Sequence, residues 1–390
     1  MQWQVLWGIE KGDEYRYIRG FLFGKEVQHV PRHYSKISEN LYVDRHLRIS
    51  ISSDQKVVVL GFCVHCETWE LSCEEIADLL SYHLARSEAS LFAAEEKLCG
   101  NYVVFYQNGD QNWRIFSDAG GLKKLFVSRK GGIVGSHAKL VEEAYLGRSV
   151  PTIRLGGEPG SSVTQAVYGY SGCVEKERFP GIYTPYKDVL LVPTNHYVCS
   201  EDSKCIRFFP AKPYRPMTLK EAAPLFEEAL ANTIRGLFHN ANKRVLVTCT
   251  AGIDSRFTLN TLMHISDNYE LIVSQRHPRD PPTQDCMACI TIANNLNIPC
   301  HYIRPASGVD YRNNREFVAF SNALDCNNYY NFSKFSNTIQ YLINKKFGVD
   351  ECIGVHSNMM ELGKGWMGRT MYKEGRDEFP HNTTYARAFQ

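Results

Sequence analysis

The sequence predicts two parts: a sheet-rich α+β N-terminal half, followed by an α/β C-terminal half built on a parallel sheet. In the N-terminal half, short β-like runs such as "KVVVLGF" and "NYVVFYQ" are separated by turn signals such as "NGD", "AGG" and "KGG". After residue 244, strand-like and helix-like segments alternate, which is typical of βαβ units. Between the two patterns, "RFFPAKPYRPM" (207–217) carries three prolines and predicts a linker.

Few helices are expected in the N-terminal half. Its further predicted strands are "HLRISIS", "WRIFS", "GGIVGS" and "DVLLVP". One helix interrupts them, over "SCEEIADLLSYHLARS" (72–87), because apolar residues recur there at helical spacing and Ser72 can cap the N-terminus.

A long amphipathic helix is expected to open the C-terminal half, because Thr218 and Glu221 form a capping-box pattern before it. Pro224 is expected to bend its first turns. The predicted strands that follow are "RVLVTCT", "YELIVSQ", "PCHYIR" and "DECIGVH", and the predicted helices are "DSRFTLNTLMHI", "TQDCMACITIANNLN", "NREFVAFSNAL" and "FSNTIQYLINKKFG". Such repeated βαβ units form a mostly parallel sheet with helices on its faces. The chain therefore divides into domains 1–206 and 218–390 with the linker 207–217 between them.

Composition narrows the class of protein. The 390 residues are 44% hydrophobic and 22% charged, which is a globular composition. A net charge of +2 argues against a large nucleic-acid-binding surface, and no apolar run reaches the ~20 residues of a membrane helix. The N-terminus becomes charged within ten residues, so no signal peptide is expected. The 13 scattered cysteines predict reduced thiols and a cytoplasmic location.

Two pairs of cysteines have the CxxC spacing. Cys63 and Cys66, with Cys73 nearby, leave a zinc site open, and buried strand cysteines are the alternative. Cys286 and Cys289 lie at i and i+3 of a predicted helix, so core packing is expected for them.

The segment "TCTAGIDSR" (248–256) lies between a predicted strand and a predicted helix, at the carboxyl end of the strand, where such sheets bind ligands. Its residues Thr250, Ala251 and Gly252 are small, so the backbone can approach a phosphate closely here. The N–H groups of the helix N-terminus and the hydroxyls of Thr250 and Ser255 favour an anion.

Asp254 is the unexpected member of this loop. A carboxylate repels phosphates unless a cation lies between them, so Asp254 indicates Mg²⁺. The alternative is an ordinary turn between strand and helix in which Asp254 and Ser255 cap the helix.

The loop resembles the pyrophosphate-binding loop Ser-Gly-Gly-x-Asp-Ser of the ATP pyrophosphatase (PP-loop) enzymes, with Thr250 for the Ser and Ala251 for the first Gly. The next unit, Ser274 followed by Asp285 and "ACITIANNLNIPCHYI", is similar to that of the asparagine synthetase group. "HSNMMELGKGW" resembles that group's acidic loop, although Met360 stands where the family has a metal-binding Asp. Glu361 could substitute for it.

The N-terminal half resembles the glutamine-amidotransferase domain of asparagine synthetases, which is an Ntn-hydrolase-like sandwich. The segments that carry this resemblance are "LCGNYVVFY" (98–106), "DAGGLKKLFV" (118–127), "GSHAKLV" (135–141) and "YTPYKDVLLVPTNHYV" (183–198). They extend the resemblance over roughly residues 90–365. That domain normally begins with a catalytic Cys after the initiator Met, and here Gln2 stands in its place. The half is therefore expected to be a scaffold, as in β-lactam synthetases and lasso-peptide cyclases.

The resemblance implies an ATP-dependent amide ligase that forms AMP and pyrophosphate. It would adenylate a carboxylate and couple it to an amine or ammonia, without glutaminase activity. The implied ATP- and pyrophosphate-binding residues are Thr248, Thr250, Ala251, Gly252, Ile253, Asp254, Ser255, Val273, Ser274 and Lys373, with Val273 and Ser274 beside the adenine. Asp254 and Glu361 would bind Mg²⁺, and Asp254, Glu361 and Lys364 would be catalytic.

Several residues keep a second interpretation. Lys364, Arg369, Lys373 and Arg376 could stabilise the leaving pyrophosphate or form a solvated basic tail. His301 and His356 lie near strand ends and are expected to be ordinary surface or core histidines. Only 29 residues follow Glu361, whereas the family has a longer helical tail with a catalytic Lys.

Two other functions stay open. One is a PP-loop enzyme that adenylates a nucleobase or carbonyl oxygen, and the other is a non-catalytic nucleotide-binding scaffold. The expected partners are a small-molecule or peptide carboxylate and an amine donor, with no nucleic acid and no membrane. A homodimer or a partner protein could supply the missing C-terminal part.

Overall fold

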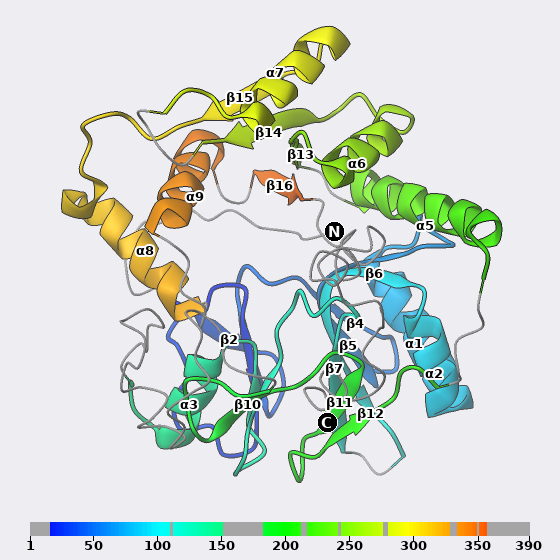
Figure 1. The fold of residues 1–390 in the computed structure, drawn as a ribbon. Helices are drawn as coiled ribbons and strands as arrows, with labels where there is room; N and C mark the ends of the chain where they lie inside the picture. The colour runs from blue at the N-terminus through cyan, green and yellow to red at the C-terminus, as the bar shows by residue number, and fades with distance from the viewer. Residues whose placement is uncertain are drawn as a thin grey trace, which may run out of the picture.

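The computed structural model describes residues 16–109, 112–150, 182–211, 217–240, 243–275, 280–327, 334–348 and 351–356. The described chain is a mixed α/β protein with two six-stranded sheets in the N-terminal half and a parallel four-stranded sheet in the C-terminal half. In Figure 1 the N-terminal half lies below and the C-terminal half above, with helix α5 at the side where they meet. No described helix combines the length and the apolar character that crossing a membrane would require.

The two sheets of the N-terminal half are antiparallel throughout and have the strand orders β10-β8-β9-β1-β3-β2 and β12-β11-β7-β6-β5-β4. The strands are β1 (Phe21–Phe23), β2 (Tyr34–Lys36), β3 (Leu41–Asp44), β4 (Ile49–Ile51), β5 (Val57–His65), β6 (Leu98–Gln107), β7 (Trp113–Ser117), β8 (Phe126–Ser128), β9 (Val134–Gly135), β10 (Val189–Leu191), β11 (His196–Cys199) and β12 (Cys205–Arg207). The helices are α1 (Cys73–Arg86), α2 (Glu88–Glu95) and α3 (Ala138–Leu146).

The two sheets share one apolar core and carry helices on their outer faces. Alternate residues of β5 and β6 point to opposite sides, so Val58 and Phe105 join the core between the sheets, while Val59 and Tyr102 pack under α1 and α2. Helix α3 covers the other sheet in the same way. The N-terminal half is therefore layered as helix, sheet, sheet and helix.

The expectation of a single helix here was wrong, because the structure adds α2 and α3. Helix α1 agrees with its prediction: the Ser72 hydroxyl accepts from the Glu75 N–H, and the Glu75 carboxylate accepts from the Ser72 N–H. Helix α2 begins directly after α1, and Ser87 is both the C-cap of α1 and the N-cap of α2. Helix α3 starts at His137, which makes no side-chain capping bond, so its sequence lacks a start signal.

The C-terminal half is the expected parallel sheet, in the order β15-β14-β13-β16. Its strands are β13 (Arg244–Thr248), β14 (Glu270–Ser274), β15 (Cys300–Ile303) and β16 (Cys352–Val355). Its helices are α5 (Leu219–Asn240), α6 (Ile253–Met263), α7 (Gln284–Leu296), α8 (Arg315–Asn327) and α9 (Lys334–Phe347), with a short 3-10 helix over Tyr311–Asn313. Val245 and Val247 face α5, α6 and α7, whereas Leu246 faces α9, so helices cover both faces of the sheet.

Helix α5 begins as predicted but the linker before it is shorter than predicted. Thr218 and Glu221 form the expected reciprocal capping bonds, and Pro224 lies inside the helix without ending it. Strand β12 includes Arg207, and the Phe208 ring stacks on Phe92 with centroids 4.4 Å apart. The first residues assigned to the linker therefore belong to the N-terminal half. Residues 212–216 of the linker lie outside the described residues.

Helix α5 also joins the two halves. The Asn232 amide donates to the Cys66 carbonyl (2.8 Å), and the Asn240 amide donates to the Leu71 carbonyl (3.3 Å). On the same helix, Ile234 and Leu237 are buried in the core of the parallel sheet. One helix thus contributes to the packing of both halves.

Candidate functional site

The candidate site lies where the strand order of the parallel sheet reverses. Chain order runs from β13 to β14 and β15 in one direction, and then returns to place β16 on the other side of β13. In open α/β sheets, ligands bind beyond the carboxyl ends of the strands at this reversal. Two contacts bridge β13 and β16 there: the Thr248 hydroxyl donates to the Val355 carbonyl (3.2 Å) and lies 2.6 Å from Nδ1 of His356.

The loop after β13 is tied together by Thr250 and Ser255. The Ser255 hydroxyl accepts from the Thr250 N–H (3.0 Å) and is within hydrogen-bond distance of the Thr250 carbonyl (3.1 Å). The Thr250 hydroxyl accepts from the Gly252 N–H (3.1 Å). Ser255 is only 5% exposed, so its hydroxyl holds the shape of the loop.

The exposed part of the loop is Ala251, Gly252 and Ile253, of which Gly252 is the N-cap of α6. The first N–H groups of a helix have no carbonyl partner inside it, and the helix dipole favours an anion there. A Cβ atom at Gly252 would lie 3.1 Å from Oγ1 of Thr250, so a larger residue would crowd the loop. The loop therefore exposes the small residues Ala251 and Gly252, the Ile253 side chain and the N-terminus of α6.

Two carboxylates belong to this region. Asp254 lies in the first turn of α6 and is half-buried. Asp285, in the first turn of α7, accepts the Ala251 N–H at Oδ1 (2.9 Å). Asp285 was part of the sequence resemblance, but its contact with the loop was missed, because it depends on how α7 packs beside β13. Its position two residues after the Thr283 N-cap was the available signal.

Val273 and Ser274 end the neighbouring strand β14. Val273 is buried and Ser274 is exposed, so only Ser274 presents its side chain to solvent at this edge. The next residue, Gln275, is 2% exposed and donates to the Asp280 carbonyl (2.7 Å), and its Oε1 accepts from the Tyr302 hydroxyl. Gln275 therefore fixes the course of the chain beyond β14, a role that its sequence context did not indicate.

His356 and His301 lie at opposite ends of the parallel strands. His356 lies at the site, and burial lowers the pKa of its imidazole, which keeps the ring neutral. His301 lies near the amino ends of the strands. It pairs there with Glu270, and Arg244 donates to the same carboxylate (2.6 Å). His301 is therefore a structural residue at the amino ends of the strands.

The cysteines pack as thiols. Cys286 and Cys289 are fully buried, as expected for core residues, and Sγ of Cys289 lies 3.7 Å from Sγ of Cys300. A hydrogen bond from Cys289 lowers the pKa of Cys249, directly before Thr250. Within the described part of the chain, no group of three or more His, Cys, Asp or Glu side chains is arranged to hold a metal ion, so nothing there supports zinc at Cys63 and Cys66.

The remaining predicted site residues lie outside the described residues, and these are Glu361, Lys364, Arg369, Lys373 and Arg376. The structure thus brings together the loop, the ends of β14 and β16, Asp254 and Asp285.

No protein-family model matches the chain, and no curated protein is significantly similar to it. The resemblance to the asparagine synthetase group therefore depends on the motifs themselves and on where the fold carries them.

Proposed function

We propose that the chain is an ATP-dependent amide ligase of the asparagine synthetase type, which forms AMP and pyrophosphate. The observation that carries the proposal is the position of the Thr-Ala-Gly-Ile-Asp-Ser loop. It follows the central strand at the reversal of a parallel sheet and leads directly into the N-terminus of α6. Ligands bind at this end of the strands in such sheets, so the loop lies where a ligand-binding motif is expected.

The residues fit a nucleotide bound through its phosphates. The backbone donors at the start of α6 would bind the pyrophosphate, and Ser255 and Thr250 would keep the loop in shape. Asp254 is the carboxylate suited to Mg²⁺, because this ion usually takes one or two protein carboxylates together with substrate phosphates. Bound there, Mg²⁺ would neutralise phosphate charge. Ser274, exposed at the end of β14, lies on the side proposed for adenine.

The reaction requires positioning more than covalent chemistry from the protein. A substrate carboxylate attacks the α-phosphorus of ATP, the bond between the α-phosphorus and the bridging oxygen breaks, and an acyl-adenylate and pyrophosphate form. An amine then displaces AMP to give the amide. The loop lacks the Gly-Lys-Ser/Thr ending of a kinase-type P-loop, so it offers no Lys to a transferred γ-phosphate.

The helix, sheet, sheet and helix layering of the N-terminal half supports an Ntn-hydrolase-like scaffold for the proposed ligase. The first described strand begins at Phe21, and Gly20 leads into it. Gly20 has no side chain, and a Cβ atom there would lie 2.2 Å from the Tyr34 hydroxyl oxygen. Gly20 is therefore closely packed at the start of β1 and carries no nucleophilic side chain.

The experiment measures substrate-dependent exchange of labelled pyrophosphate into ATP, with Mg²⁺ and a panel of amino acids and small carboxylates. We expect exchange with one class of carboxylate, and AMP as the nucleotide product once an amine is added. Asp254→Asn should abolish exchange while the protein stays folded, whereas Asp267→Asn, an exposed control, should retain it. Substrate-dependent ADP formation, or full exchange by Asp254→Asn, would refute the proposal.

A further inference from the structure

A cavity of about 810 Å³ opens in the N-terminal half and shares no residue with the candidate ATP site. Its walls come from the chain before β1, the segment 29–33 before β2, Arg45 after β3, Glu143 of α3, and Ser149 after that helix. The cavity is of the size that holds small-molecule ligands, which is roughly 300–1,000 Å³.

Three arginines and two histidines are among the ten described residues that line the cavity. The basic and imidazole side chains that line the cavity are Arg16, Arg32, Arg45, His29 and His33. Of the described residues that line it, Glu143 is the one carboxylate. The histidines add N–H donors, so the cavity offers hydrogen-bond donors and positive charge together.

The carboxylate of Glu143 is already compensated. It forms an ion pair with Lys139, which is itself 3% exposed, and it accepts from the Tyr17 hydroxyl (2.6 Å). It also accepts from the Ser149 hydroxyl and the Val150 N–H, each at 3.0 Å. With its charge balanced by Lys139 and its oxygens occupied, Glu143 does not neutralise the arginines of the cavity.

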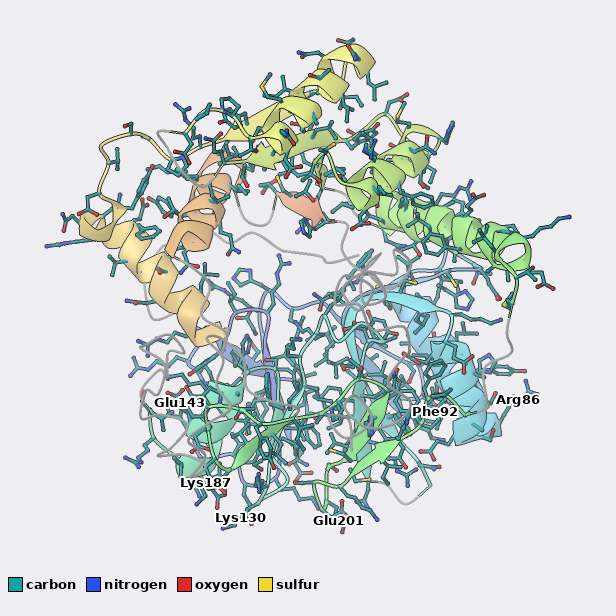
Figure 2. The ribbon with its side chains drawn as sticks, in the orientation of Figure 1. Arg86, Phe92, Lys130, Glu143, Lys187 and Glu201 are labelled. Atoms are coloured by element: carbon teal, nitrogen blue, oxygen red, sulfur yellow. The ribbon has the colours of Figure 1, made fainter. Side chains whose placement is uncertain are left out.

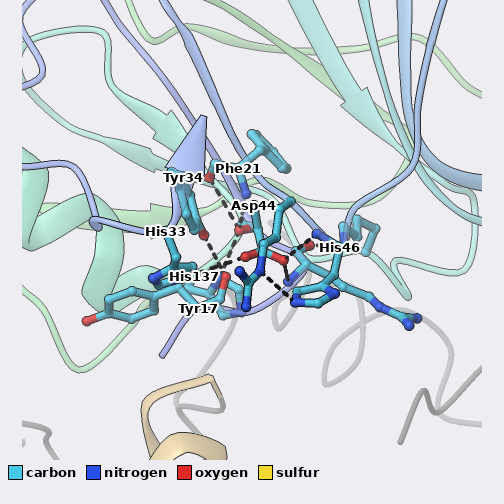
Figure 3. Close-up of polar contacts among 11 residues, drawn as sticks. Tyr17, Phe21, His33, Tyr34, Asp44, His46 and His137 are labelled. Atoms are coloured by element: carbon cyan, nitrogen blue, oxygen red, sulfur yellow. Dashed lines mark hydrogen bonds and ion pairs between the residues drawn. The ribbon is translucent and has the colours of Figure 1, made fainter. Parts of the chain in front are cut away.

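Tyr17, which lines the cavity, lies in a turn with unusual backbone angles. Tyr17 and Arg19 have φ angles of 61° and 47°, a left-handed conformation that bulky residues seldom adopt. The Tyr17 carbonyl accepts from the Gly20 N–H (3.0 Å) and from the Tyr34 hydroxyl (2.6 Å), which holds the turn in place (Figure 3). Strained backbone that is fixed in this way concentrates at functional sites.

His33 lies beside a buried acid. Its Nε2 lies 3.7 Å from Oδ2 of Asp44, and the other carboxylate oxygen of Asp44 accepts from the N–H groups of Arg19 and His46. Figure 3 shows this group of side chains beside Tyr17. The His33 side chain is 10% exposed, so this imidazole is largely buried in the wall, while Arg32 and Arg45 are exposed residues.

We propose that this cavity binds a small polyanion, a molecule with two or more phosphate or carboxylate groups. Guanidinium groups present paired N–H donors that match both oxyanions, and several of them around one cavity favour a ligand with more than one negative charge. The hydrogen-bonded turn at Tyr17 reduces the ordering that binding would require. The site is independent of the proposed ligase activity.

The test titrates the full chain with inorganic tripolyphosphate, and separately with citrate, by calorimetry at fixed ionic strength in buffer freed of divalent cations by a chelating resin. This buffer contains no Mg²⁺, which the candidate ATP site is proposed to require, and no soluble chelator that could compete for the cavity. The test variant is Arg32→Glu with Arg45→Glu. The control, Arg86→Glu with Lys204→Glu, changes the net charge equally at two exposed positions outside the cavity. Figure 2 shows Arg86 and Glu143 at opposite sides of the N-terminal half. Thermal melts confirm that both variants fold.

We expect the unaltered chain to bind at least one of the two anions, and the stronger one identifies phosphate or carboxylate as the ligand chemistry. Arg32→Glu with Arg45→Glu should weaken that binding at least tenfold, and the control pair should change it less than twofold. Ala251→Asp, which adds a carboxylate to the candidate ATP loop, should leave it unchanged. Failure of both anions to bind, equal losses in the two charge-reversal variants, or loss in Ala251→Asp would overturn the proposal.

Discussion

Glu95 illustrates how burial alone changes the chemistry of a side chain. It is the last residue of α2, is 4% exposed, and accepts a hydrogen bond from the Tyr102 hydroxyl (3.0 Å). Burial raises the pKa of its carboxyl to about 7, because the charged form loses its hydration. Near neutral pH the folded protein therefore binds a proton that the unfolded chain has already released.

This raised pKa predicts a specific dependence of stability on pH. The contribution of Glu95 is fully present below the ordinary carboxyl pKa and is lost as the pH rises through about 7. Glu95→Gln should therefore stabilise the protein more at pH 8 than at pH 5, by up to about 3 kcal/mol of unfolding free energy. Urea unfolding at both pH values measures this difference. Glu96→Gln, at the exposed neighbour, should show no such difference, and equal behaviour of the two variants would contradict the assignment.

Among the elements, α1 has the most complete N-terminal cap. Ser72→Ala removes the acceptor of the Glu75 N–H bond and weakens the reciprocal contact. We expect a loss of about 1 kcal/mol of unfolding free energy, because that is the usual contribution of such a cap. Ser35→Ala, at an exposed position in β2, is the matched control and should change stability by less than half of that amount. Denaturant unfolding of both variants tests the comparison.

Elements with a local sequence signal could be predicted, including the short strands β4 and β10, and elements without such a signal could not. Helices α1 and α5 carry capping boxes, and the parallel strands are continuous apolar runs, so each has a local signal. Strands β1 and β2 have three residues each, too few to show a period, and α3 lacks a capping side chain. Their formation depends on pairing and packing with distant parts of the chain.

The candidate site divides in the same way. The loop itself could be predicted, because its small residues, Asp and Ser follow a strand and begin a helix. The bond from the Ala251 N–H to Asp285 and the contact between Thr248 and His356 join segments 34 and 108 residues apart. No local pattern encodes such contacts, because they require the strand order of the finished sheet.

At the scale of the whole molecule, Gly236 decides how closely α5 approaches the N-terminal half. A Cβ atom there would lie 2.3 Å from Cγ1 of Val64 and 3.1 Å from the Trp69 carbonyl oxygen. Gly236→Ala should therefore destabilise the protein by roughly 1–3 kcal/mol, as overpacking does in a closely packed interface. Urea unfolding provides the measurement, and Gly109→Ala, which adds a Cβ into open space, is the control.

The contact between position 236 and Val64 also predicts that a second substitution restores part of the lost stability. Val64→Ala removes the atom that the new Cβ would strike, so the double variant Gly236→Ala with Val64→Ala should regain part of the loss. Simple additivity of the two single variants would show that the close approach of α5 to β5 does not limit packing there.

The position of β16 beside β13 also determines the order in which the chain can assemble during synthesis. Thr248 contacts His356, which lies 108 residues later in the chain. A ribosome synthesises that stretch in roughly 5–20 s at common elongation rates. During that interval β14 can pair with one edge of β13, while the other edge presents open backbone groups. The antiparallel strands β4 to β7 have no such delay, because each pairs with the strand next to it in the chain. In a nascent chain that stalls before residue 352, the antiparallel strands of the N-terminal half can already be paired. Without β16, strand β13 forms an exposed edge of the C-terminal sheet. A chaperone or a second chain could pair with that edge.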